Sequence, residues 1–335
     1  MAVKIGERTI RLENSTGIIA SAGIAGKKES EGPLAAHFDK IFNDDTLGEK
    51  TWEKAEIRLQ TEAVNTVFEK SGFSAKDIDI VLAGDLLDQC ISSTYGMRSF
   101  GIPFLGQYGA CSTMAQALLV GSILVDSCAA EKVLAVTSSH FCSAERQFRL
   151  PIEYGGQRNL TAQWTVTGAG AAVIGKGNTA CRIEDVTIGK ITDMGITDSS
   201  DMGAAMAPAA ADTISSYLND TQTSPEDYDI ILTGDLGAVG SELLCELLMK
   251  EGKDISRVHR DCGKLIFARE YQDVHAGGSG CGCCASVFCS YIMKKIISGE
   301  LNNILFAATG ALMSVKASKQ GESIPGIAHL IHLRK

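Results

Sequence analysis

The chain has 335 residues, of which 45% are hydrophobic and 21% are charged, and its 35 glycines are typical of a globular protein with many tight turns. The net charge of −9 argues against nucleic acid as a general partner, because that binding needs a positive field. Eleven scattered cysteines and an N-terminus without an apolar run predict a reduced, cytoplasmic protein and exclude a secreted disulfide scaffold.

In chain order, the first clear element is a helix over residues 52–70, where apolar residues recur at helical spacing. Residues 99–125 carry no charge, but Pro103 and several glycines break their first half, so they cannot form one membrane span. We expect a short buried strand, a glycine turn and a helix over residues 113–125. Because this helix is apolar all round, it belongs in the centre of the protein.

The chain contains one short segment twice, at an offset of 150 residues. Residues 74–86 read Ser-Ala-Lys-Asp-Ile-Asp-Ile-Val-Leu-Ala-Gly-Asp-Leu and residues 224–236 read Ser-Pro-Glu-Asp-Tyr-Asp-Ile-Ile-Leu-Thr-Gly-Asp-Leu, with eight of thirteen positions identical. In each copy the Ser and the Asp three residues later suit a helical turn, and an apolar strand then ends at Gly-Asp. Asp85 and Asp235 therefore end equivalent strands.

The elements after the two copies also follow the same order. Each copy leads to a glycine turn, an apolar helix and two strands, predicted at residues 113–125, 132–137 and 170–174 in one half and at 285–297, 303–308 and 326–333 in the other. We therefore expect an α/β protein with two homologous halves, residues 1–180 and 181–335, layered as a sandwich of helices and sheets. A shared pocket is expected where the two central helices begin.

Two further segments complete the prediction. Ser241 is expected to cap a short helix whose apolar face is made of leucines. Residues 141–165 are polar, basic and aromatic and fit neither a helix nor a strand pattern. We interpret them as a long inserted loop, of the kind that usually carries function.

Cys111 is the sharpest candidate for a functional residue. It stands in Gly109-Ala110-Cys111-Ser112, between a strand and the first turn of the apolar helix. Free backbone N–H groups and the positive end of the helix dipole lower the pKa of a thiol there and attract anions. The alternative is a small buried cysteine that packs as a hydrophobic residue.

Longer stretches of the chain are similar to one family within the thiolase and ketoacyl synthase superfamily. They are Ala83-Gly84-Asp85-Leu86-Leu87, Gly109-Ala110-Cys111-Ser112-Thr113, Thr137-Ser138-Ser139-His140, Ala144-Glu145-Arg146-Gln147-Phe148-Arg149 and Ala276-Gly277-Gly278-Ser279-Gly280-Cys281. They resemble the stage V sporulation protein AD family of spore-forming bacteria. The resemblance implies a thiolase-like α-β-α-β-α sandwich with buried central helices. It also implies binding of dipicolinic acid (pyridine-2,6-dicarboxylic acid) within the machinery that moves this acid into developing spores and out on germination.

The catalytic residues of the superfamily are only partly present. Condensing enzymes place a His and an Asn, or two His, from the second half beside the cysteine, to stabilise the oxyanion. Where that His is expected the chain has Gly234-Asp235, and the glycine loop at residues 277–284 contains neither His nor Asn. We therefore predict a non-enzyme that has kept only Cys111. His275 is the one candidate for a replacement base, and the alternative is a structural or exposed histidine.

The resemblance assigns ligand binding to Asp85 together with Cys111 and its neighbour Ser112. Asp235 is expected to face the same pocket from the other side. A carboxylate beside a dianionic ligand has two physical roles open to it: it accepts hydrogen bonds from a backbone or water network, or it coordinates Ca²⁺ that travels with the acid. The alternative for both aspartates is a turn or capping role.

The inserted loop supplies cationic candidates. His140, Arg146, Arg149 and Arg158 cluster in or beside it, and guanidinium groups suit bidentate contacts with a planar dicarboxylate. The alternative is that these arginines pair with Glu145 and Glu153 to hold the loop or a dimer contact. The cysteine run at residues 280–284 lacks the second pair that a zinc or iron–sulfur site needs, so it is interpreted as small residues that let helices approach.

Three functions remain open at this stage. The first is non-catalytic binding of dipicolinic acid by a homodimer, with no cofactor beyond a calcium ion accompanying the acid. The second is an acyltransferase with Cys111 as nucleophile and His275 or His140 as base, and the third is a structural scaffold of a spore membrane channel. No predicted span is present, so we expect a cytoplasmic protein attached to the inner spore membrane through integral membrane proteins.

Overall fold

The computed structural model describes residues 2–148 and 158–335. Its strands are ordered β12-β11-β14-β15-β10-β3-β9-β7-β5-β6. The first group of five comprises β3 (Thr16–Ala25), β9 (Gly168–Lys176), β7 (Val133–Ser139), β5 (Ile80–Gly84) and β6 (Phe104–Gly106). The second comprises β10 (Cys181–Thr187), β15 (Gly326–Arg334), β14 (Asn303–Ala311), β11 (Ile230–Thr233) and β12 (His259–Asp261).

The two groups repeat one pairing pattern. Read outward from β3 and from β10, each group has two antiparallel pairings followed by two parallel ones. The groups meet where β3 pairs with β10, through Ile18 opposite Cys181 and Gly17 opposite Arg182. This topology mirrors the sequence repeat, and β10 begins at residue 181. The division of the chain into two domains at that residue stays a prediction.

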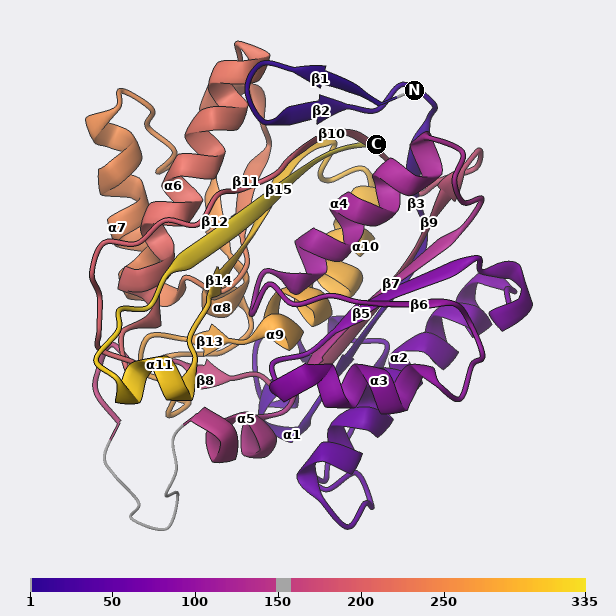
Figure 1. Ribbon diagram of the computed structural model, residues 1–335, viewed down its shortest axis with the longest axis horizontal. Coiled ribbons are helices and arrows are strands. Elements are labelled where there is room, and N and C mark those ends of the chain that lie inside the picture. The colour runs from indigo at the N-terminus through magenta and orange to yellow at the C-terminus, as the bar shows by residue number, and fades with distance from the viewer. Residues whose placement is uncertain (1, 149–157) are drawn as a thin grey trace.

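The helices complete the layers. The main ones are α2 (Trp52–Ser71), α3 (Ile91–Met97), α4 (Thr113–Asp126), α6 (Met202–Thr221), α7 (Gly237–Lys250) and α9 (Cys281–Val287), which continues through Phe288–Ile292 into α10 (Met293–Ser298). Figure 1 shows α4 and α9–α10 in the middle, with α2 and α3 on one side and α6 and α7 on the other. α4 packs on β7 and β9 of one group and on β14 and β15 of the other. The expected sandwich with buried central helices is confirmed.

Short elements decorate this frame. They are β1 (Val3–Ile5), β2 (Thr9–Arg11), β4 (Lys40–Ile41), β8 (Trp164–Thr165), β13 (Gly278–Ser279), α1 (Lys27–Ser30), α5 (Phe141–Phe148), α8 (Cys262–Leu265) and α11 (Val315–Lys319). β8 and β13 pair in parallel as a separate two-stranded sheet. Because β8 and α5 both come from residues 141–165, this segment is not one loop throughout, as its mixed composition suggested.

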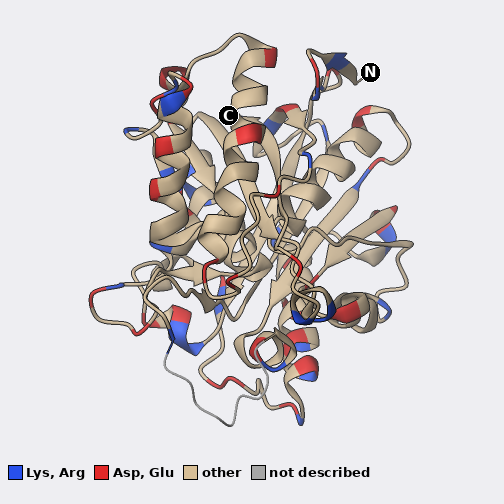
Figure 2. Ribbon diagram, turned by 60° about the vertical axis from the view of Figure 1, so that its left-hand side comes forward, with Lys and Arg blue, Asp and Glu red and all other residues tan. Residues whose placement is uncertain are grey.

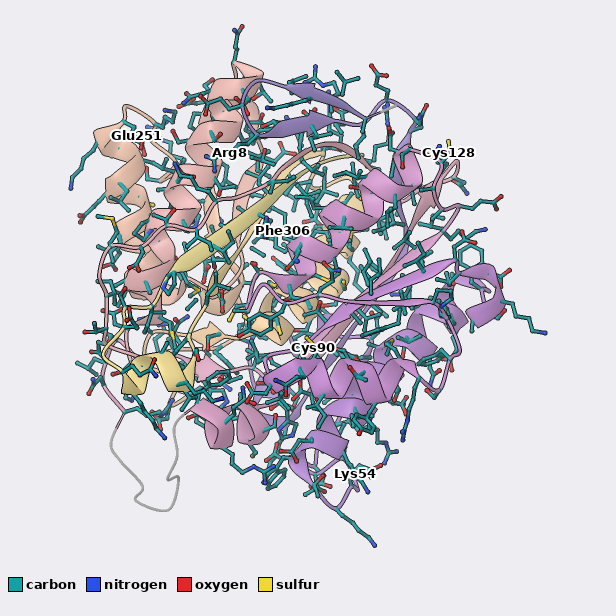
Figure 3. All side chains as sticks on the ribbon, in the orientation of Figure 1. Arg8, Lys54, Cys90, Cys128, Glu251 and Phe306 are labelled. Carbon is teal, nitrogen blue, oxygen red and sulfur yellow. The ribbon has the colours of Figure 1, made fainter. Side chains whose placement is uncertain are left out.

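Small residues let α9 lie directly on the sheet. A Cβ at Gly170 of β9 would meet the carbonyl oxygen of Ala285 at 2.3 Å, and one at Gly282 would meet that of Gly168 at 2.4 Å. Deeper in the core, Phe306, labelled in Figure 3, stacks on Phe288 with the ring centroids 4.5 Å apart. The described residues include no group of three His, Cys, Asp or Glu side chains placed to hold a metal. The cysteine-rich run lies where α9 packs closely against the sheet.

Charge lies on the outside of this body. Figure 2 shows the Lys, Arg, Asp and Glu residues mainly on the outer helices and loops, with few on the strands and central helices. One stretch, Cys281–Ser298, is long and apolar enough to cross a membrane by composition alone, and 72% of it is buried inside the protein. It is the central core helix of the second half.

Local signals in the sequence have mixed outcomes. Ser74 and Ser224 each form a capping box with the Asp three residues later, as the repeat predicted. The helix predicted at residues 113–125 ends one residue later, at Asp126. Two predictions are wrong. Ser241 lies inside α7, which already begins at Gly237, and the strand before the glycine turn, β6, is exposed because it forms the end of the sheet.

Candidate functional site

Cys111 sits on a tight turn before α4. Ala110 adopts a left-handed conformation, with φ of 48°, and the backbone N–H of Ser112 donates to the carbonyl oxygen of Gly109 at 3.0 Å. Gly310 of β14 packs against this turn so closely that a Cβ there would meet the Gly109 carbonyl oxygen at 2.2 Å. The turn is therefore fixed by its own hydrogen bonds and by the second half of the molecule.

A cavity of about 60 Å³ opens beside this turn. Its polar lining comprises Tyr108, Cys111, Glu145, Thr165, Asp235 and Ser279, and its apolar walls include Leu86, Ala144, Phe148, Met202, Met206 and Met313. These residues come from both halves, so the cavity lies at their junction, as the repeat predicted. No Lys, Arg, His or Asn is found among the described residues that line it.

Asp235 reaches the cavity from the end of β11. Its Oδ2 accepts a hydrogen bond from the backbone N–H of Gly280 at 2.8 Å, and its Oδ1 accepts one from Oγ1 of Thr309 at 2.9 Å. The side chain is fully buried, and this burial raises the pKa of the carboxyl group to about 7 in spite of the hydrogen bonds.

Cys111 and Asp235 both line the cavity and interact across it. Burial raises the pKa of the Cys111 thiol well above 9, and the neighbouring Asp235 raises it further. The expectation that the helix start lowers the pKa of this thiol is therefore wrong. Desolvation and a facing carboxylate outweigh the dipole of one helix, whose effect is worth about 1 kcal/mol.

Asp85, to which the resemblance assigned ligand binding, is held by hydrogen bonds next to its own strand. Its Oδ1 accepts from the backbone N–H of Leu87 at 3.0 Å, and its Oδ2 accepts from the N–H and hydroxyl of Ser93 at 2.8 and 2.7 Å. The carboxyl group is fully buried beneath α3 and is not among the residues that line the cavity. It holds the turn after β5, which is the capping role weighed as the alternative.

Ser112 and His140 also lie outside the cavity lining. Ser112 is buried and its hydroxyl donates to the Gly109 carbonyl oxygen at 2.7 Å. His140 is buried, with Nε2 at 2.7 Å from the backbone oxygen of Asp45, and its ring stacks on Trp52 with the centroids 5.7 Å apart. Burial lowers the pKa of His140, so it is held as a neutral structural residue.

The cationic candidates do not gather at the cavity. Arg146 is half-exposed and forms an ion pair with Glu53 of α2. Arg158 pairs with Asp273 at 2.9 Å and lies over the ring of Trp164, with 4.7 Å to the centroid. Arg149 lies outside the described residues. The predicted bidentate clamp is not formed by the arginines that the structure describes.

His275 is placed away from the thiol as well. Its Nδ1 lies 2.6 Å from the backbone oxygen of Asn159 and its Nε2 lies 3.0 Å from a carboxylate oxygen of Asp273. Both ring nitrogens are therefore occupied by partners outside the cavity lining. A role as the base for Cys111 has no support in this geometry.

Several lining residues were not identified from the sequence. Tyr108 stands at the mouth with 47% of its surface exposed, and burial of its phenol raises its pKa to about 12. Met202 and Met206 enter from α6, one turn apart on the same face. The Met residues gave no local signal, because methionines at helical spacing are typical of any buried helix face.

Comparisons with known proteins agree with this architecture. The family model described as "Stage V sporulation protein AD (SpoVAD)" matches residues 6–334. The stage V sporulation protein AD of Bacillus subtilis is 47% identical over 324 residues, which cover 97% of this chain and 96% of that protein.

Solved structures show the fold. The 3-oxoacyl-[acyl-carrier-protein] synthase III of Aquifex aeolicus has a TM-score of 0.59 at 13% identity, and the match covers 96% of this chain and 100% of that protein's chain. The acetyl-CoA acetyltransferase of Syntrophomonas wolfei has a TM-score of 0.57 at 11% identity, again with 96% of this chain and all of its own. At such identities the likeness extends to the fold alone. With its duplicated sheets, its turn at Cys111 and the family match over nearly all its length, the chain belongs to the stage V sporulation protein AD family, and it is a sporulation protein with a thiolase-like fold.

Proposed function

We propose that the protein binds dipicolinic acid in the cavity between Cys111 and Asp235 and catalyses no reaction there. In this proposal it serves the machinery that moves the acid into developing spores and releases it on germination. The observation that carries the proposal is that Asp235 faces Cys111 from the opposite wall of the cavity. It puts a carboxyl group at the place where a condensing enzyme needs a base and a hydrogen-bond donor.

This arrangement disfavours covalent catalysis at Cys111. A cysteine nucleophile reacts as the thiolate, and a thiol with a pKa well above 9 carries under 1% thiolate at neutral pH. An oxyanion that formed beside Asp235 would meet a carboxyl group that is partly ionised at neutral pH, in place of the two fixed donors of a condensing enzyme.

The same cavity suits one end of a small aromatic acid. Residues just before α4 and α9 line it, so the positive ends of both helices lie beside the cavity and favour a carboxyl group. Met202, Met206 and Phe148 form adaptable apolar walls for a ring. Tyr108 stands at the mouth, where the second carboxyl group would reach water.

Thermal shift measurements test this proposal. Dipicolinic acid at about 100 times its Kd should stabilise the fold by about 2.7 kcal/mol. The shift should be present in the wild type and in Cys128→Ala, and lost in Cys111→Ala and Asp235→Ala. Cys128 is the matched control, because it lies just beyond the opposite end of α4 and is exposed.

Two outcomes would replace the proposal with its alternatives. Stabilisation by an acyl-CoA, with a covalent mass increase on Cys111, would establish the acyltransferase. Absence of any shift with dipicolinic acid in the wild type would leave the channel scaffold as the explanation.

We further propose that the protein acts as a homodimer joined through β6. Within the described residues β6 pairs only with β5, so its outer edge is open. Phe104 and Leu105 of β6 and Ile91 and Tyr95 of α3 are exposed, between 36% and 49%. Antiparallel pairing of two β6 strands across a twofold axis would continue the sheet and cover these apolar side chains.

Attachment to the inner spore membrane from the cytoplasmic side is proposed to depend on integral membrane partners. The helix with spanning length, Cys281–Ser298, is committed to the core, because 72% of it is buried. Flotation with liposomes tests this: the purified protein should stay unbound and should float only when partner membrane proteins are present.

A further inference from the structure

The charges around the cavity set a problem for an anionic ligand. Its described lining includes the carboxyl groups of Asp235 and Glu145 and no cationic side chain. A ligand that carries two carboxylates would therefore place like charges against each other in a partly desolvated space, which is strongly unfavourable. Helix N-termini offset only part of that repulsion.

The hydrogen bonds of Asp235 leave room for one more interaction. Gly280 donates to Oδ2 and Thr309 donates to Oδ1, whereas an ionised carboxylate has about four acceptor sites. The Cys111 thiol faces the same carboxyl group. A protonated Asp235 keeps these acceptor positions and gains an O–H group that can donate to a ligand on the cavity side.

Burial and the charge of Asp261 favour the protonated form of Asp235, and they outweigh the interactions with Cys111, Gly280 and Thr309, which favour the ionised form. Asp261, from the end of β12, adds a second carboxyl group on the side away from the cavity. The thiols of Cys111, Cys283 and Cys284 approach from the starts of α4 and α9. Glu145 of α5 lines the same cavity. No cation faces Asp235 among these groups, and its pKa of about 7 agrees with that environment.

We propose that Asp235 is the specificity-determining residue of the site and holds a ligand carboxylate through a carboxyl–carboxylate hydrogen bond, so that each acid molecule binds together with one proton. In this step the O–H of Asp235 donates to an oxygen of the ligand carboxylate. Where Asp235 was ionised, the proton is taken from solvent, and no covalent bond of the ligand changes. The inference rests on the proposed function. It adds the protonation state of Asp235 in the complex and the selectivity of the site for carboxylic acids.

The proposal makes a different prediction from binding through calcium. A calcium ion between two carboxylates requires ionised Asp235, so binding would rise with pH and would fail when Asp235 is replaced by Asn. A proton shared between Asp235 and the ligand requires protonated Asp235 instead. Binding falls with rising pH, and Asn, which always carries N–H donors, substitutes for the protonated acid. The Thr309 hydroxyl accepts as readily as it donates, so it can adapt to the amide.

Isothermal titration of dipicolinic acid into the full chain, in EDTA, tests the proposal. The titrations are run at pH 6 and at pH 8, each in two buffers with different ionisation enthalpies, so that proton uptake can be measured. Carboxyl groups titrate near pH 4, so both carboxyl groups of the ligand stay ionised over this range. With a pKa near 7, the protonated fraction of Asp235 falls about tenfold between pH 6 and pH 8. Because only this fraction binds, the wild type should bind about tenfold more weakly at pH 8 than at pH 6. It should also take up nearly one proton per ligand at pH 8.

Variants complete the experiment. Asp235→Asn should bind with the same affinity at both pH values and without proton uptake, and Glu145→Gln, the control on the same wall, should keep the pH dependence. Equal wild-type affinity at pH 6 and pH 8 without proton uptake would overturn the inference and leave the proposed function standing. So would loss of binding in Asp235→Asn while its thermal midpoint is unchanged. No binding at either pH would overturn the inference and the proposed function together.

Discussion

Asp85 and Asp235 occupy the same position in the two halves and are used differently. Asp85 accepts three hydrogen bonds from its own half, from Leu87 and Ser93. Asp235 accepts from Gly280 and Thr309 and contacts Cys111 in the other half. One aspartate holds a turn and the other faces a cavity.

The cause of this difference lies in Asp261. In the first half the N–H of Leu87, the second residue after the aspartate, donates to Asp85 itself. In the second half the equivalent N–H, that of Gly237, donates to Asp261 at 3.0 Å, as does the N–H of Leu236 at 2.9 Å. The carboxyl group of Asp261, at the end of β12, thus accepts the hydrogen bonds of this turn. Asp235 does not accept them, and its side chain faces the cavity instead. This exchange of hydrogen-bond partners places the side chain of Asp235 at the cavity.

The largest expected effect is on folding and belongs to Asp85. Replacement by Ala leaves two backbone N–H groups and a hydroxyl without their buried acceptor, which should cost about 3–5 kcal/mol of unfolding free energy. Asp235→Ala should cost less, because Asp235 accepts two hydrogen bonds, from Gly280 and Thr309, where Asp85 accepts three. Chemical denaturation of both variants checks this order. A stable Asp85→Ala that no longer binds dipicolinic acid would show instead that Asp85 contacts the ligand.

The next effect concerns the contact between the halves at Gly310. A methyl group there would overlap the Gly109 carbonyl oxygen and displace the turn that carries Cys111, so Gly310→Ala should cost about 2–3 kcal/mol and lose the ligand. Gly106→Ala is the matched control, since its nearest neighbour lies at 3.4 Å. Unfolding and binding are measured on both variants. Full binding by a stable Gly310→Ala would mean that the position of the turn is unimportant.

The smallest effect on stability is expected at the outer strands of the two halves. β6 exposes Phe104 and Leu105, whereas its equivalent β12 buries His259 and Asp261. Leu105→Lys should therefore convert a dimer to a monomer with less than about 0.5 kcal/mol change in the monomer fold, as for other exposed positions. Light scattering after size exclusion measures the mass, with Ile297→Lys, exposed on α10, as control. A dimeric Leu105→Lys would place the interface elsewhere.

Much of the fold was predictable from the sequence because it depends on local and repeated signals. The two copies of the capping box and strand predicted two equivalent halves, which appear as two groups of strands with the same pairing pattern. The uncharged run after Gly109 predicted the central helix to within one residue. The exposure of β6 was not predictable in the same way. An apolar stretch looks alike in the core and at an open edge of a sheet, and only the order of strands decides between them.

The site was predictable in its location and not in its chemistry. A cysteine at a helix start marked the turn, and the repeat marked the junction of the halves. The pKa of the thiol depends on which side chains face it, and Asp235, Met202 and Met206 come from distant elements. The resemblance pointed to Asp85, whose hydrogen bonds hold the turn after β5, and its role in ligand binding stays a prediction.

The reactivity of Cys111 tests most directly whether this site is a binding pocket. The rate of alkylation by iodoacetamide, followed by mass spectrometry of the Cys111 peptide from pH 6 to pH 10, reports the thiolate, and the exposed Cys128 serves as internal reference. The account predicts that Cys111 reacts more slowly than Cys128 and that its rate is still rising above pH 9. A Cys111 that reacts faster than Cys128 and reaches its full rate below pH 7 would be an activated nucleophile, and the non-catalytic account would be wrong.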